Sequence, residues 1–123
     1  MTKKFFEKMF LKPEYSLAVL HMPEDLYDVL KTENKSDGEL KNMYNFILAF
    51  YTKKTDLENE ISLLRKSLSE NGLLWIAYPK AKALDTDLNR DILHSATAKY
   101  GLDGISLISL NETWSAMRFK RLN

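Results

Sequence analysis

The sequence contains no cysteine among its 123 residues. This absence excludes disulfide bonds, thiolate metal sites and a cysteine nucleophile, and it fits a reducing compartment. Histidine is also scarce, since His21 and His94 are the only two. They are not spaced four residues apart, as a pair on one helix face would be, so we expect no metal site built on histidine or cysteine.

Charge of one sign and long apolar runs are equally scarce. The formal net charge of +1 gives no overall field that would attract nucleic acid or an anionic membrane. The longest apolar runs, 46–51 and 73–78, fall far below the roughly 20 residues that cross a bilayer. The basic and aromatic segment 1–10 lacks the apolar stretch of a signal peptide. We therefore expect a cytoplasmic protein with no nucleic-acid partner and no membrane partner.

What the sequence does contain is the composition of a globular protein. Hydrophobic residues make up 45% of the chain and charged residues 28%, which a disordered chain would not show. A chain of this length matches one hydrophobic core, so residues 1–123 are expected to form a single α/β domain.

Apolar runs without polar alternation are typical of parallel strands that are covered on both faces. Such runs occur at 16–22, 45–51 and 73–78. They alternate with helical spacing of apolar residues at 5–10, at 26–30, at 57–68, and from a cap at Asp85 or Thr86 to Tyr100. Thr55 and Glu58 match a capping box at the start of the helix that contains 57–68. Gly72 is predicted to end this helix.

Two further strand-like segments, 105–110 and 114–120, are separated by only three residues and predict an antiparallel hairpin. Strands that alternate with helices form a parallel sheet with helices on both faces. The predicted fold is therefore a reduced Rossmann-like three-layer sandwich. It has about five strands, four of them parallel, and ends in a C-terminal antiparallel hairpin.

Glycine is missing where this fold class binds nucleotides. The turn after the first strand, His21–Asp25, contains none, and Glu24 and Asp25 would repel a phosphate there. Only 14 residues lie between Leu30 and Asn45, too few for a strand, a helix and a second strand. Conventional binding of a nucleotide or of S-adenosylmethionine is therefore not expected, and no cofactor is predicted.

Ligands of open α/β sheets bind outside the carboxyl ends of the strands, near the switch in strand order. The candidate ligand-binding residues at that edge are His21, Glu24, Thr52, Lys53, Lys80, Lys82 and Glu112. They combine acids, bases and an imidazole suited to proton transfer. Strand ends are polar throughout this fold class, however, so the same residues also fit a purely structural role, and no catalytic residue is assigned.

Two of these candidates and one tryptophan have specific alternatives. Lys80 and Lys82 precede a predicted helix start and fit either an anion clamp or a solvated loop. Trp114 begins the last predicted strand, where it either seals the sheet against a helix or anchors an interaction.

Three segments carry a family resemblance, namely Gly72–Lys80, Thr86–Leu88 and Asn111–Phe119. Together with Leu11–Pro13 and His21–Glu24, they resemble an uncharacterised bacterial family, domain of unknown function 3052. The resemblance implies an order of elements similar to a methyltransferase sheet that has lost its cofactor half. It transfers no activity, and the chain departs from the family pattern by lacking glycine after Glu24.

The sequence therefore predicts a non-catalytic binding or interaction domain rather than an enzyme. A protein partner, or self-association through a sheet edge or through the aromatic segment 5–10, is left open. The alternative is a small anionic-ligand site or an enzyme at the carboxyl edge, which would use Lys80 and Lys82 with His21 or Glu112.

Overall fold

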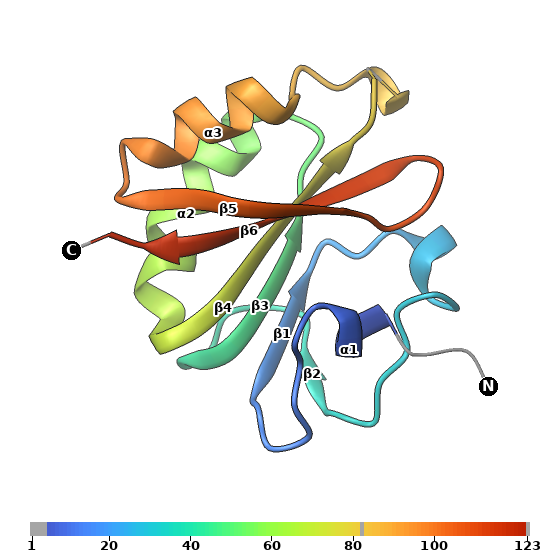
Figure 1. Ribbon diagram of the computed structural model, residues 1–123, viewed down its shortest axis with the longest axis vertical. Coiled ribbons are helices and arrows are strands. Elements are labelled where there is room, and N and C mark those ends of the chain that lie inside the picture. Colours follow the sequence, from blue (N-terminus) through green and yellow to red (C-terminus); the bar gives the residue numbers. More distant parts are fainter. Residues whose placement is uncertain (1–4, 82, 123) are drawn as a thin grey trace.

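The computed structural model describes residues 5–81 and 83–122, which form a six-stranded mixed sheet in the order β2-β1-β3-β4-β6-β5 (Figure 1). Strands β1 to β4 are parallel, and β6 runs antiparallel between β4 and β5. The elements along the chain are α1 (Phe5–Lys8), β1 (Leu17–Leu20), the 3₁₀ turn η1 (Glu24–Leu26), β2 (Ser36–Asp37), β3 (Tyr44–Phe50), α2 (Lys54–Ser67), β4 (Leu68–Pro79), the 3₁₀ turn η2 (Ala83–Asp85), α3 (Arg90–Ala98), β5 (Leu102–Ser109) and β6 (Trp114–Arg121). The predicted Rossmann-like fold with its C-terminal hairpin is confirmed.

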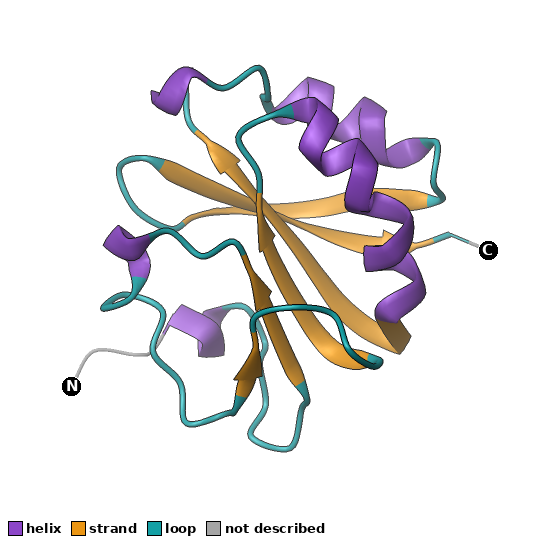
Figure 2. Ribbon diagram, turned by 180° about the vertical axis from the view of Figure 1, so that it is seen from behind, coloured by secondary structure: helices purple, strands orange, loops and turns teal. Residues whose placement is uncertain are grey.

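The sheet has an apolar core on each face. Figure 2 shows α2 and α3 together on one face, while α1 and η1 lie on the other. Alternate residues of β3 divide between the two cores, with Ile47 and Ala49 toward α2 and α3, and Phe46 and Leu48 toward α1. Burial on both faces explains why the strand is a continuous apolar run. Within the residues described, no helix is long and apolar enough to cross a membrane.

The segment after β1 differs from the prediction in two ways. Only one 3₁₀ turn, η1, forms where a helix over 26–30 was expected, although Leu26 and Leu30 are both buried. A sixth strand, β2, pairs with the beginning of β1 through Ser36 and Asp37. Its two polar residues at a sheet edge carry no apolar signal, so the five-strand prediction missed it.

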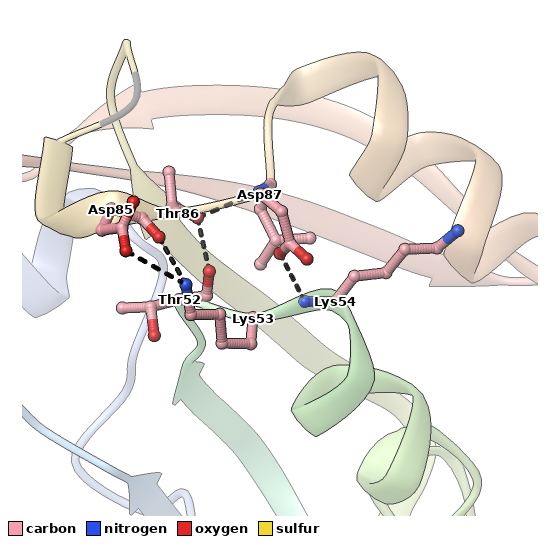
Figure 3. Close-up of polar contacts among 7 residues, drawn as sticks. Thr52, Lys53, Lys54, Asp85, Thr86 and Asp87 are labelled. Atoms are coloured by element: carbon pink, nitrogen blue, oxygen red, sulfur yellow. Dashed lines mark hydrogen bonds and ion pairs between the residues drawn. The ribbon is translucent and has the colours of Figure 1, made fainter.

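The start of α2 is capped from a distance and not by its own sequence. The predicted capping box is wrong, because Thr55 already lies inside the helix and Lys53, at the N-cap position, makes no side-chain cap. Instead, the Lys54 amide donates to Oδ1 of Asp87 at 2.8 Å (Figure 3).

Neighbouring hydrogen bonds strengthen the same connection. The Thr86 hydroxyl donates to the Thr52 carbonyl at 2.6 Å, and Nζ of Lys53 donates to the Asp85 carbonyl (Figure 3). The corner between β3 and α2 is therefore fixed to the segment that precedes α3.

The predicted ends of two helices also move. Helix α2 ends at Ser67, and Gly72 lies within a bulge of β4, where a Cβ would come within 2.8 Å of the Ser69 carbonyl oxygen. Helix α3 is capped by Asn89, whose side chain accepts from the Ile92 amide at 2.8 Å, and not by Asp85 or Thr86. Gly72 is therefore required by the close approach of the Ser69 backbone and not by the end of a helix.

Replacing Asp87 by alanine is expected to lower the free energy of unfolding by about 1 kcal/mol, the usual cost of losing a helix cap. Urea denaturation of both proteins at neutral pH measures the difference. Asp28→Ala is the matched control, because the Asp28 side chain is almost fully exposed and makes only a surface ion pair. An equal loss in the two variants would contradict the capping role of Asp87.

Candidate functional site

A cavity of about 530 Å³ lies at the carboxyl ends of β1 and β3. The chain leaves β1 toward β2 and leaves β3 toward β4, on opposite sides, so this is the switch in strand order where open α/β sheets bind ligands. Its size is within the range of about 300–1,000 Å³ that is usual for small-molecule sites. The cavity is lined by His21, Pro23, Phe50, Tyr51, Thr52, Asp56, Asn59, Glu60 and Trp114.

His21 enters this cavity from an unusual backbone conformation. It directly follows β1 with a φ of 60°, in the left-handed region that glycine adopts without strain. Its Nε2 lies 2.9 Å from Oε1 of Glu60, and its ring meets Tyr51 edge to face at 5.6 Å between centroids. With 52% of its side chain exposed, the imidazole is both held in place and accessible.

Glu60 is shared by two donors. The Tyr51 hydroxyl donates to the same Oε1 of Glu60 at 2.6 Å. Burial raises the pKa of Tyr51, and the hydrogen bond to Glu60 and the charges of Glu60 and Asp56 raise it further. Burial opposes ionisation of Glu60, but the hydrogen bonds from Tyr51 and His21 and the charge of His21 lower its pKa overall.

These shifts define the proton positions at neutral pH. Glu60 is ionised and can only accept hydrogen bonds, so Nε2 of His21 must carry the hydrogen between them. Nδ1 of His21 is therefore the basic nitrogen of the neutral ring. A carboxylate that orients an imidazole in this way prepares the imidazole to take up a proton from another group.

The walls of the cavity are acidic and aromatic. Asp56 and Glu60 contribute carboxylates, and neither lysine nor arginine is among its lining residues in the described parts of the chain. Phe50 and Trp114 pack edge to face at 5.1 Å, and Tyr51 adds a third ring. Carboxylates with no lysine or arginine beside them to balance their charge suit a cation.

Trp114 lines this cavity as a buried side chain. It is only 3% exposed, and its buried Nε1 has no hydrogen-bond partner among residues 5–81 and 83–122. The indole therefore contributes an apolar wall to the cavity and not an accessible donor.

The structure gathers some of the predicted site residues and separates others. His21, Thr52 and Trp114 line the same cavity. Lys53 is directed to Asp85, and Glu24 and Glu112 are exposed outside the cavity lining.

Of the two lysines of the predicted anion clamp, the structure describes only Lys80. Nζ of Lys80 donates to the Ser109 hydroxyl and to the Asn111 carbonyl at 2.5 and 2.6 Å, so it supports the turn between β5 and β6. Lys82 lies outside the described residues.

Four lining residues with polar side-chain groups were missed by the sequence analysis, namely Tyr51, Asp56, Asn59 and Glu60. Asn59 and Glu60 follow Asp56 by three and four residues, so the three side chains share one face of α2 beside its apolar stripe. That spacing, directly after a buried strand, was the available signal.

Asp37 closes β2 but does not contribute to the cavity. Its carboxylate accepts from the Tyr44 hydroxyl at 2.5 Å, and Tyr44 begins β3, at the opposite end of that strand from the cavity. Within the described ranges, no three His, Cys, Asp or Glu side chains are gathered as metal ligands.

Replacing Tyr51 by phenylalanine is expected to raise the pKa of Glu60, because a hydrogen bond to its ionised form is lost. The lowered pKa of Glu60 stabilises the fold above its ordinary pKa of 4.5, and this contribution is lost as the pH falls through the folded-state pKa. Stability should therefore fall less steeply on acidification in the variant.

Carbon-detected NMR titration of the glutamate carboxyl groups measures this shift in the Tyr51→Phe protein. Tyr78→Phe serves as control, since Tyr78 is also buried at a strand end but is not bonded to Glu60. An unchanged Glu60 titration in the folded Tyr51→Phe variant would show that the hydrogen bond does not control this group.

Because His21 has a positive φ, a glycine variant at this position is expected to be more stable than an alanine variant, the reverse of the usual order. His21→Gly is expected to be more stable than His21→Ala by about 1 kcal/mol, because only glycine adopts this φ freely. At Tyr27, an exposed position with φ −57°, alanine should be the more stable of the two. Thermal and urea unfolding of the four variants measures both orders, and the same order at both positions would refute strain at His21.

No family model and no curated protein sequence matches this chain. The resemblance to domain of unknown function 3052 is therefore not confirmed, whereas the methyltransferase-like fold is.

Solved structures of methyltransferases do match the chain over most of its length. An S-adenosylmethionine-dependent methyltransferase from Clostridium acetobutylicum ATCC 824 superposes with a TM-score of 0.64 at 6% identity, covering 95% of this chain and 87% of the other. A ribosomal protein L11 methylase from Lactobacillus delbrueckii subsp. bulgaricus gives 0.59 at 11% identity over 95% and 74%. A methyltransferase from Pyrococcus furiosus gives 0.59 at 9% identity over 93% and 78%.

These likenesses correct one prediction. The sequence predicted a non-catalytic binding or interaction domain. This prediction is wrong, because nearly the whole chain superposes on solved structures of methyltransferases. At such low identities the likeness shows the fold: this chain has the architecture of S-adenosylmethionine-dependent methyltransferases.

Proposed function

We propose that this chain is a methyltransferase-type enzyme that binds S-adenosylmethionine in the cavity at the carboxyl ends of β1 and β3. The observation that carries the proposal is the acidic and aromatic lining of that cavity, located at the switch point of a methyltransferase-like sheet.

The residues present fit a sulfonium ligand through its charge. The carboxylates of Asp56 and Glu60 attract a cation, and three aromatic residues line the same cavity. An anionic cofactor would instead face two carboxylates with no lining lysine or arginine to balance them.

The ligand contacts must differ from those of a glycine-rich turn. The turn after β1 carries His21, Glu24 and Asp25 in place of glycines, and the acid that closes β2 is bonded to Tyr44. Binding would therefore rely on side chains from α2 and from the end of β3, and not on close approach to the backbone of this turn.

Asp56 and Glu60 would hold S-adenosylmethionine through its positive charge, and the cofactor would supply an electrophilic methyl group for an acceptor oxygen or nitrogen, with a neutral thioether as the leaving group. Nδ1 of His21 takes the proton that the acceptor loses. Glu60 orients the ring through Nε2 and stabilises the imidazolium, while Tyr51 holds Glu60 in its ionised form.

Calorimetric titration with S-adenosylmethionine and with the neutral S-adenosylhomocysteine tests the charge argument. Asp56→Asn is expected to weaken S-adenosylmethionine binding about tenfold, a loss of about 1.4 kcal/mol, and to weaken the neutral ligand less. Glu58→Gln is the matched control, since Glu58 lies on the same helix but pairs with Lys99.

Turnover is measured separately, as release of S-adenosylhomocysteine in the presence of small alcohol and amine acceptors. His21→Ala should keep the binding and lose the turnover. Failure of the folded wild-type protein to bind either ligand would overturn the proposal, as would equal losses in Asp56→Asn and Glu58→Gln.

A further inference from the structure

We propose that the chain has a second, separate site at the opposite end of β4, which binds a phosphate group. A cavity of about 420 Å³ lies there, between the bulge at the beginning of β4 and the last residues of β6. The catalytic proposal does not involve it.

The charged residues that line this second cavity are mostly basic. Arg118, Lys120 and Arg121 come from β6, and Glu70 of the β4 bulge is the single acid among the lining residues that the structure describes. Three positive charges against one negative charge make this region attractive to an anion, in contrast to the cavity at the other end of the sheet.

Arg121 is fixed in position by the end of α2. Its Nη2 donates to the carbonyl oxygens of Arg65 and Leu68 at 2.7 and 2.6 Å. Its Nε, and likewise the Nε of Arg65, is buried without a hydrogen-bond partner within residues 5–81 and 83–122. The two Nη2 contacts hold the guanidinium against the end of α2, where it adds positive charge beside the cavity.

Arg118 is ordered by contacts that leave most of its donors free. Its Nε lies 3.3 Å from the Ser106 hydroxyl, and its guanidinium stacks on the ring of Phe10 at 5.1 Å. The Phe10 ring is 54% exposed, and Ile105, which lines the cavity, is 42% exposed. The cationic groups therefore adjoin an uncovered apolar surface.

The geometry favours phosphate over a simple halide ion, because Arg118 and Lys120 share one face of β6 and offer several N–H donors to one group with several acceptor oxygens. The source is either inorganic phosphate or a phosphate ester. The apolar surface around Phe10 and Ile105 would contact the organic part of an ester but not the free ion.

NMR titration of the ¹⁵N-labelled protein with inorganic phosphate, against sodium chloride at equal ionic strength, tests the site. Shifts are expected in residues 69–73 and 118–121. The double variant Arg118→Gln/Lys120→Gln should weaken phosphate binding at least tenfold. The matched control, Arg90→Gln/Lys99→Gln, removes the same charge from exposed positions on α3 and beside it.

Each outcome has a defined meaning. Tighter binding of phenyl phosphate than of inorganic phosphate would identify an ester as the source, and equal binding would identify the free ion. Equal weakening of phosphate binding in the two double variants would show that the protein's net charge accounts for the binding, and it would overturn the site. Phosphate-dependent shifts confined to other residues of the folded protein would overturn it as well, whether or not S-adenosylmethionine binds at the other cavity.

Discussion

The structure depends on the burial of β3 on both faces of the sheet. Every residue of this strand from Phe46 onward is nearly inaccessible, so successive side chains alternate between two cores. At the carboxyl end the alternation places Phe50 toward Trp114 and Tyr51 toward α2. Both residues nevertheless line one cavity, because β3 ends there. The constraint that forms the sheet therefore also forms the walls of the candidate site.

The sequence predicted the sheet well and the helix ends poorly. Apolar runs at 45–51 and 73–78 mark strands covered on both faces, and this signal is local to each run. The cap of α2 is not local, since the acceptor is Asp87, so the Thr55–Glu58 pattern was misleading. The edge strand β2 has no apolar residue to reveal it. Local sequence patterns therefore predict strands whose position is set by burial. They do not predict helix caps or edge strands whose partner is distant in the sequence.

The candidate site followed the same division. The sequence placed His21 and Thr52 at one edge because strand ends meet there, and it singled out Trp114 separately as the start of the last strand. Glu60 was not singled out, because its importance lies in its bonds to His21 and Tyr51. Lys80 was predicted to face a ligand but supports the β5–β6 turn. The two cavities lie at opposite ends of the sheet, and one is lined by the carboxylates of Asp56 and Glu60, whereas the charged side chains that line the other are mostly basic.

The bond between Lys54 and Asp87 also has a consequence for the order of folding. Its two ends are 33 residues apart, and the intervening chain contains α2 itself and all of β4. The first turn of α2 thus lacks its cap until β4 has joined the sheet and the segment beyond it has docked. Contacts of such long sequence separation form late, because the intervening chain must first be ordered. Asp56 and Glu60 lie in the first two turns of this helix, so the cavity takes its final shape only after the sheet is assembled.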